Sequence, residues 1–137
     1  MDIRANIKGV QHIGIPTNDI RKSISFYEGI GFKVVYQTMN EEAHEAVAFL
    51  QLENLVMEVY ENRQAVMSSG AIDHVALDVT DIDVLFSAMQ AAGYELVNEK
   101  VQYLPFWEHG VKFFTIVGPN REKIEFCERL KGIKQEE

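Results

Sequence analysis

The feature that most constrains this chain is an internal repeat. Residues 10–35, VQHIGIPTNDIRKSISFYEGIGFKVV, align without a gap with residues 72–97, IDHVALDVTDIDVLFSAMQAAGYELV, at an offset of 62 positions. The identical pairs are His12 with His74, Asp19 with Asp81, Ile20 with Ile82, Ser25 with Ser87, Gly31 with Gly93 and Val35 with Val97. A repeat of this kind indicates one supersecondary unit used twice. A histidine at the same place in both copies is the first indication of chemistry.

The first copy predicts a strand, a helix and three further strands. Residues 10–16 alternate as in a strand. Thr17, Asn18 and Asp19 offer caps for a helix that Gly29 and Gly31 are expected to end. Residues 38–45 are polar, and we expect them to be irregular. The other three strands are expected at residues 32–36, 46–52 and 54–61.

The second copy predicts the same order of elements. A strand over residues 72–79 precedes a helix that Thr80 or Asp81 is expected to cap and Gly93 to stop. We expect residues 102–110 to form a loop. The remaining strands are expected at residues 94–99, 111–117 and 123–128. Beyond the gap-free stretch the offset grows, and the matched pairs are Phe49 with Phe114 and Glu58 with Glu125.

Length and composition limit the class of protein. The 137 residues fit one domain, 1–137, built of two modules at about 8–62 and 71–130. The net charge of -8 argues against nucleic acid or an anionic membrane as a partner, and no apolar run is long enough to cross a bilayer. Cys127 is the single cysteine and the N-terminus lacks a signal-peptide core, so we expect a cytoplasmic protein.

The candidate chemistry lies in four residues that the repeat places equivalently. Each copy has a histidine in its first strand and a glutamate in its last: His12 and Glu58, then His74 and Glu125. Strand alternation gives these side chains small or polar neighbours, whereas the opposite faces are apolar and are expected to lie under the helices. Two neutral imidazoles and two carboxylates suit a divalent cation such as Ni, Co, Zn, Fe or Mn.

Each ligand also has a plain structural interpretation. A single histidine in a strand is more often a structural residue, and a single glutamate at a strand end is more often solvated. Four such residues at matching places in a two-fold repeat favour the metal site. Buried carboxylates without a cation or partner are also costly, by roughly several kcal/mol.

The repeat and its four ligands resemble the vicinal oxygen chelate superfamily. HIGIPTNDIRKSISFYEGIGF is similar to the opening segment of that family, and GPNREKIEFCE is similar to its closing strand with a metal-binding glutamate. The resemblance implies an α+β fold of two βαβββ modules in tandem, with a cupped mixed β-sheet and helices on its outer face. It also implies a homodimer.

Within the superfamily, the ligand order His, Glu, His, Glu is most similar to bacterial glyoxalase I (lactoylglutathione lyase). This resemblance implies an isomerase or lyase that transfers a proton through a metal-bound enediolate of a small oxygenated substrate, such as a hemithioacetal. Glu125 and Glu58 are the implied catalytic carboxylates. Pro16 departs from the pattern, because bacterial glyoxalase I has a glutathione-contacting arginine there. The alternatives are an epimerase similar to methylmalonyl-CoA epimerase and a non-catalytic binding protein similar to bleomycin-resistance proteins.

Five further residues are candidates for substrate contacts. Asn62 matches a glutathione-contacting position of the family. His44 and His109 occupy corresponding loops and either bind a substrate anion or are solvated. Phe106 and Trp107 either line an apolar part of the pocket or hold their own loop in place.

Overall fold

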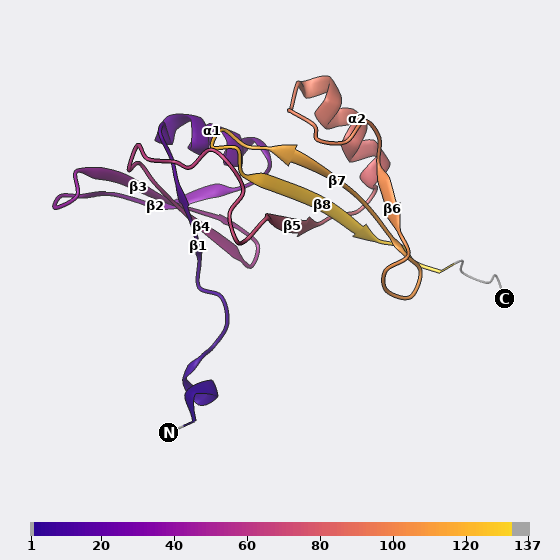
Figure 1. Ribbon diagram of the computed structural model, residues 1–137, viewed down its shortest axis with the longest axis horizontal. Helices are drawn as coiled ribbons and strands as arrows, with labels where there is room; N and C mark the ends of the chain where they lie inside the picture. The colour runs from indigo at the N-terminus through magenta and orange to yellow at the C-terminus, as the bar shows by residue number, and fades with distance from the viewer. Residues whose placement is uncertain (1, 133–137) are drawn as a thin grey trace. The chain divides into compact units, whose positions relative to one another are not determined.

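The structure is a computed structural model that describes residues 2–132. It divides into two compact units, Met1–Val66 and Met67–Glu137, and each unit has the element order βαβββ (Figure 1). The elements of the first unit, after a short 3-10 helix η1 (Ile3–Asn6), are β1 (Ile13–Pro16), α1 (Ile20–Gly29), β2 (Lys33–Asn40), β3 (Glu45–Leu52) and β4 (Leu55–Tyr60). Those of the second unit are β5 (His74–Asp78), α2 (Ile82–Ala92), β6 (Gln102–Leu104), β7 (Val111–Val117) and β8 (Lys123–Arg129). The predicted α+β fold of two βαβββ modules is confirmed, whereas their union into a single domain stays a prediction.

Each unit forms its own four-stranded mixed sheet. The strand orders are β1-β4-β3-β2 and β5-β8-β7-β6, so the first and last strands of each unit lie side by side. These neighbours are parallel, and the other pairs are antiparallel. The pairing of first strand with last strand is what brings each predicted histidine to its predicted glutamate.

Strand alternation separates the core of the first unit from its candidate ligands. Met57 and Val59 of β4 are fully buried, and α1 packs against β2, β3 and β4. Glu58 lies between these two residues and therefore points to the opposite face of the sheet.

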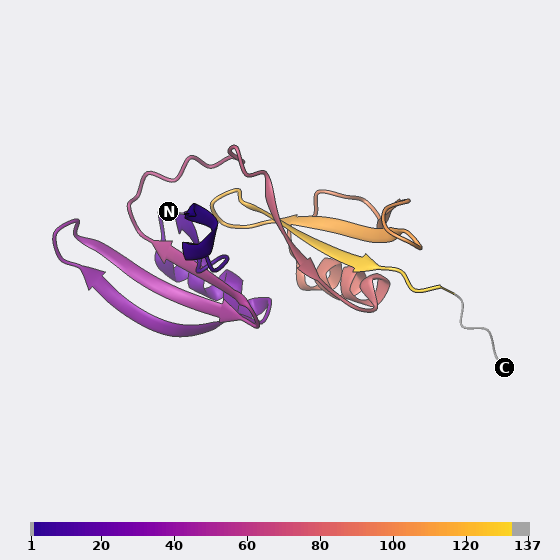
Figure 2. The same cartoon turned by 90° about the horizontal axis from the view of Figure 1, so that it is seen from below.

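The second unit is built in the same way. Ile124 and Phe126 of β8 are buried, and Phe126 stacks on Phe114 with 5.1 Å between ring centroids. Helix α2 packs against β7 and β8 (Figure 2). Phe86 of α2 meets Phe114 edge-on. Glu125 lies on the other face of β8, so the helix of each unit covers the face that lacks the glutamate.

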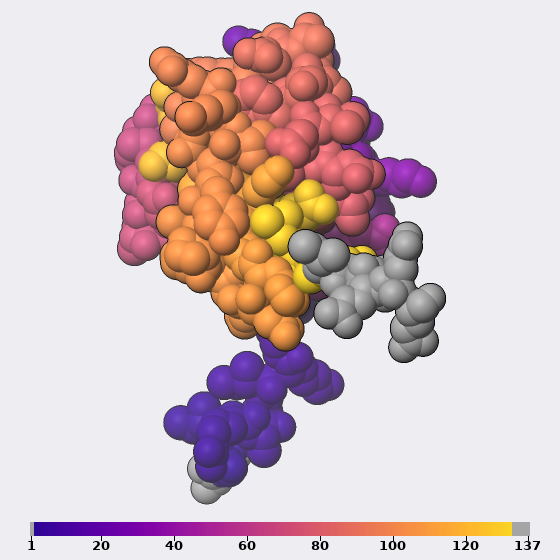
Figure 3. Space-filling model, turned by 90° about the vertical axis from the view of Figure 1, so that its right-hand side faces the viewer, coloured from indigo at the N-terminus to yellow at the C-terminus, as the bar shows by residue number. Residues whose placement is uncertain are grey.

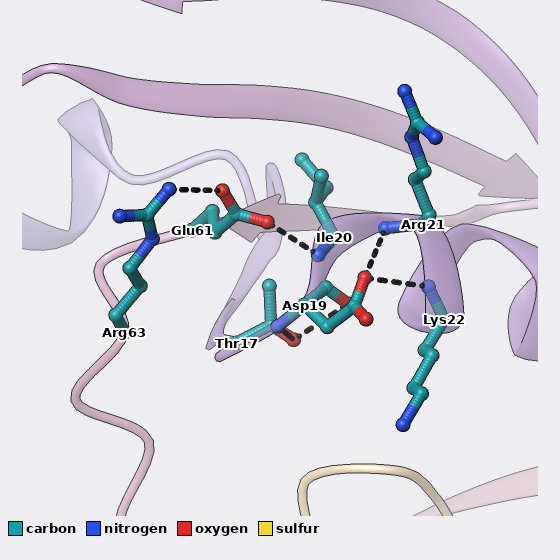
Figure 4. A network of polar contacts seen from close by, with 7 residues as sticks. All are labelled: Thr17, Asp19, Ile20, Arg21, Lys22, Glu61 and Arg63. Carbon is teal, nitrogen blue, oxygen red and sulfur yellow. Dashed lines mark hydrogen bonds and ion pairs between the residues drawn. The ribbon is translucent and has the colours of Figure 1, made fainter.

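Glutamates from distant strand ends cap both helices. In the first unit, Glu61 Oε2 accepts a hydrogen bond from the Ile20 N–H at 2.8 Å, and Asp19 accepts from the next two N–H groups (Figure 4). In the second unit, Glu128 accepts from the N–H groups of Asp81 and Ile82 at 3.3 and 3.0 Å. The prediction that Thr80 or Asp81 caps α2 is wrong for Asp81, whose backbone is left-handed and whose side chain makes no capping bond to the described residues.

Two strand predictions also need correction. Strand β2 continues to Asn40 through residues expected to be irregular, because its hairpin with β3 keeps pairing there. Residues 94–99 form only a single bridge, between Leu96 and Ile116. The side-chain oxygen of Asn98 accepts a hydrogen bond from the Thr115 N–H at 2.9 Å, which ends the backbone pairing. Pairing with β7 resumes at β6, inside the predicted loop.

The alignment of Phe49 with Phe114 is wrong by one residue. Phe49 pairs with Glu58 in the sheet register, whereas Thr115 pairs with Glu125. A shift of one residue moves a side chain to the other face of a strand. Phe114 accordingly lies in the core, and Phe49 lies on the glutamate face.

Candidate metal centre

The first half-site pairs His12 with Glu58. Gly14 of β1 lies beside Glu58 in the parallel register, and His12 precedes Gly14 by two residues, just before β1 begins. His12 Nε2 and Glu58 Oε1 are 3.5 Å apart, and the glutamate side chain is 28% exposed. Phe49 meets the imidazole edge-on, with 5.5 Å between ring centroids. The histidine therefore has one polar and one aromatic neighbour on this face.

The second half-site repeats the arrangement with His74 and Glu125. Ala76 of β5 lies beside Glu125 in the register, and His74 again precedes it by two residues. His74 Nε2 and Glu125 Oε2 are 3.2 Å apart, and the glutamate side chain is 17% exposed. Each unit thus presents one imidazole nitrogen and one carboxylate in close approach.

The other ring nitrogen of each histidine has an oxygen partner. His12 Nδ1 lies 2.9 Å from Gln11 Oε1, and His74 Nδ1 lies 3.0 Å from Asp73 Oδ2. The hydrogen bond from His74, together with one from Lys123, lowers the pKa of Asp73 below its usual value. An ionised carboxylate only accepts hydrogen bonds, so Nδ1 of His74 is the protonated nitrogen.

This geometry tests whether the residues fit a metal ion. With the proton on Nδ1, Nε2 carries a lone pair toward the carboxylate, and both groups are electron-pair donors. Only a cation or an added proton between them makes that approach favourable. Neutral imidazole held through its second nitrogen is also the usual state of a histidine ligand. The donor set in each unit therefore fits a divalent cation.

Each unit supplies only half of the predicted four-ligand set. Within residues 2–132, no group of three or more His, Cys, Asp or Glu side chains is arranged to hold a metal ion. The union of the two halves, within one chain or between two chains, stays a prediction.

Cys127 follows Glu125 by two residues in β8. Burial, and to a smaller extent the charge of Glu125, raises the pKa of the Cys127 thiol.

Two predicted substrate residues lie together in the first unit. His44 and Asn62 line one open hollow of about 640 Å³, together with Tyr60 and Arg63. A methyl group built on Gly14 would lie 3.5 Å from the Tyr60 ring and 3.8 Å from Glu58 Oε1. Tyr60, which lines the hollow, follows Glu58 by two residues in β4 and therefore lies on the same face of the strand.

The other predicted substrate residues lie on the loop between β6 and β7 of the second unit. Phe106 and Trp107 are exposed there, and the Arg129 guanidinium lies 3.9 Å from the Trp107 ring centroid. His109 is exposed, and its Nε2 lies 3.9 Å from Glu108 Oε1. The orange surface in Figure 3 belongs to this part of the second unit. Among the described residues, no hydrogen bond, ion pair or ring contact joins these three residues to His74 or Glu125.

Sequence reasoning missed the partners of the two histidines and the glutamates that cap the two helices. Gln11 and Asp73 each precede a histidine, and Glu61 and Glu128 each follow a ligand glutamate by three residues. Both sets recur at equivalent places in the two copies. That recurrence is the signal by which they could have been found.

Tandem βαβββ units that each present a histidine and a glutamate on one sheet face define a class of duplicated small proteins. The sequence matches the Glyoxalase/Bleomycin resistance protein/Dioxygenase superfamily over residues 9–126, and the chain belongs to this superfamily. The predicted nearer resemblance to bacterial glyoxalase I stays a prediction.

Comparison with known proteins supports the family and the fold. The uncharacterized protein YwbC of Bacillus subtilis (strain 168) is 31% identical over 127 residues, which cover 89% of this chain and 98% of that protein. A glyoxalase family protein from Enterococcus faecalis has a TM-score of 0.75 at 21% identity, covering 89% of this chain and 98% of that one. The fosfomycin resistance protein FosX from Listeria monocytogenes, in complex with Mn(II) and sulfate, has a TM-score of 0.71 at 16% identity over 90% and 94% of the two chains. At these identities the two structures show the fold.

In the described residues, every helix is too short or too polar to span a membrane.

Proposed function

We propose that the chain is a metal-dependent isomerase or lyase of glyoxalase I type. The observation that carries this proposal is the close pair of histidine Nε2 and glutamate carboxylate oxygen in each unit, 3.5 and 3.2 Å apart. His12, Glu58, His74 and Glu125 would hold the ion. The donor set suits Ni, Zn, Co, Fe or Mn, and FosX, a protein of the same fold, was obtained with Mn(II).

The chemistry of the site follows from its donors. A divalent cation supplies Lewis acidity, which makes a carbon next to a carbonyl more acidic. The protein must then provide a base beside that carbon. A carboxylate can accept the proton and return it to the neighbouring carbon, so the net reaction is an isomerisation without an added reactant.

Glu125 is the carboxylate that we assign as the base. It is less exposed than Glu58 and lies closer to its histidine, at 3.2 rather than 3.5 Å. Water around a carboxylate weakens its contact with a substrate, so the more enclosed glutamate is better placed to take a proton from carbon. The predicted resemblance to glyoxalase I also supports a base in the second unit.

The hollow beside the first half-site is the proposed site for the polar tail of the substrate. His44, Asn62 and Arg63 line it together with Glu45 and Glu61, and Tyr60, which also lines it, lies on the face of β4 that carries Glu58. The imidazole, amide and guanidinium groups all donate hydrogen bonds, which suits a carboxylate or an amide of a small molecule. Contacts from Phe106, Trp107 and His109 to the substrate stay predictions.

The test compares Glu125→Gln with Glu58→Gln. Glutamine has the shape of glutamate but is a far weaker base. We expect Glu125→Gln to lower the exchange of substrate protons with deuterated solvent by about 10²- to 10⁴-fold, the usual contribution of a general base. Glu58→Gln should stay within about tenfold of the original protein. Exchange is followed by NMR, with a hemithioacetal of methylglyoxal and a thiol other than glutathione as the first probe.

Metal content is the control for both variants. Each is analysed by mass spectrometry after purification without chelator, so that lost metal is not mistaken for a lost base. If Glu58→Gln abolishes exchange while Glu125→Gln retains it, the roles of the two carboxylates are reversed. If the original protein takes up no divalent cation, the chain is a metal-free binding protein and the proposal is wrong.

A further inference from the structure

The two half-sites differ in what holds their histidines. The partner of Nδ1 is the residue just before the histidine in both units, so Gln11 and Asp73 occupy equivalent places in the repeat. The distances are nearly the same, at 2.9 and 3.0 Å. Gln11 contributes a neutral amide oxygen, whereas Asp73 contributes a carboxylate. The second histidine therefore has a charged partner and the first does not.

Asp73 is itself held by a second strand. Lys123 Nζ lies 3.2 Å from Asp73 Oδ1, while Oδ2 faces the imidazole. Lys123 lies opposite His74 in the β5–β8 register and precedes Glu125 by two residues on the same face of β8. An ammonium only donates and an ionised carboxylate only accepts. Lys123 and Nδ1 of His74 therefore both donate to Asp73, one to each of its oxygens.

We propose that Asp73, held by Lys123, is a positioning residue that makes His74 the stronger imidazole ligand of the two units. A carboxylate on Nδ1 keeps the proton on that nitrogen and increases the electron-donating strength of Nε2. At His12 the oxygen that faces Nδ1 belongs to the neutral amide of Gln11, which lacks this charge. This inference rests on the proposed function, because it assigns a task to a residue beside a proposed metal ligand.

The first test measures the ring tautomers in metal-free protein of full length. Two-bond proton–nitrogen NMR spectra of ¹⁵N-histidine-labelled protein at pH 8 distinguish a proton on Nδ1 from one on Nε2. We expect Nδ1–H for His74, and we expect Asp73→Ala to shift it toward Nε2–H. Asp73→Asn should keep Nδ1–H, because its amide oxygen still accepts. The Asp73 side chain is 57% exposed, so these substitutions leave the core intact.

His12 is the internal reference in the same spectra, since its partner Gln11 lies in the other unit. Its tautomer should be unchanged by Asp73→Ala and should change in the matched variant Gln11→Ala. A His74 ring that is protonated on Nε2 in the original protein, or one whose spectrum ignores Asp73→Ala, overturns the inference.

The second test measures Ni²⁺ affinity by titration calorimetry. Loss of an outer partner of a histidine ligand usually weakens metal binding by about 10- to 100-fold, and we expect this for Asp73→Ala. Asp73→Asn, Lys123→Met and Gln11→Ala should each have a smaller effect. Equal affinity of Asp73→Ala and the original protein overturns the inference and leaves the proposed function standing. If the original protein binds no Ni²⁺ or Zn²⁺, the proposed function fails, and the tautomer of His74 decides this inference alone.

Discussion

Replacing Glu61 with alanine removes the carboxylate that caps α1 from a distant strand end. Glu61 Oε2 accepts the Ile20 N–H at 2.8 Å, and its charge lies at the positive end of the helix dipole (Figure 4). Its other oxygen lies 3.5 Å from the guanidinium of Arg63, whose side chain is 79% exposed. An ion pair this exposed contributes little, so the cap accounts for most of the expected effect.

The size of the effect follows from the kind of hydrogen bond that is lost. A hydrogen bond to a charged group contributes about 1.5–3 kcal/mol, and a lost cap costs about 1 kcal/mol. Asp19 still accepts from Arg21 and Lys22 in the variant. We therefore expect Glu61→Ala to lower the free energy of unfolding by about 1.5–2 kcal/mol, or roughly 5–7 °C in Tm. Glu61→Gln keeps an acceptor oxygen and should cost about 0.5–1 kcal/mol.

Urea unfolding followed by far-UV circular dichroism measures these changes. The matched variant is Glu128→Ala, which removes the equivalent cap of α2 and should move the fluorescence transition of Trp107, the only tryptophan. Glu41→Ala is the surface control, because Glu41 is exposed in the turn between β2 and β3. If Glu61→Ala is within about 0.5 kcal/mol of that control, the distant cap does not stabilise the helix.

Three further predictions concern metal, assembly and the thiol. Saturating Ni²⁺ or Zn²⁺ should raise Tm, because metal at a hundredfold excess over Kd adds about 2.7 kcal/mol to the free energy of unfolding. EDTA should lower Tm, and a melting curve that neither metal nor EDTA changes contradicts the metal site. Light scattering should show a homodimer at micromolar concentration, since β2 is an edge strand with exposed Val35, Tyr36 and Met39, and a clean monomer contradicts this. Because Pro16 replaces the arginine that bacterial glyoxalase I uses, turnover of the glutathione hemithioacetal should be weak, and a kcat/KM of about 10⁵ M⁻¹s⁻¹ or more would show the inference wrong.

The architecture could be predicted because the repeat aligns without a gap over the first strand and the helix of each unit. One offset carries His12 to His74 and the first strand and helix with them, so each interpretation of one copy checks the other. Alternation then separates Glu58 from its buried neighbours Met57 and Val59, and the structure has the same separation. Period-two patterning is a strong signal wherever one face of a sheet is buried.

The errors arose where contacts are distant in the sequence. The Asn98 side chain bonds to the backbone of Thr115, and the Glu128 side chain bonds to the backbone of Ile82. Both replace a local partner with one that lies far along the chain. Neither leaves a trace in hydrophobic periodicity or in local capping patterns. A polar side chain that substitutes for a backbone group ends a strand or caps a helix without changing the apolar pattern around it.

The partners of the two histidines escaped prediction for a different reason. Successive residues of a strand point to opposite faces, so the residue before a strand histidine is not expected to touch its ring. His12 lies just before β1, and His74 is the first residue of β5, so Gln11 and Asp73 lie outside the regular strands. Outside a strand the alternation rule does not apply, and the preceding side chain can turn back to the imidazole. For a ligand histidine at the start of a strand, the strand pattern therefore does not determine which residue contacts its second ring nitrogen. In this chain that partner is an amide in one unit and a carboxylate in the other.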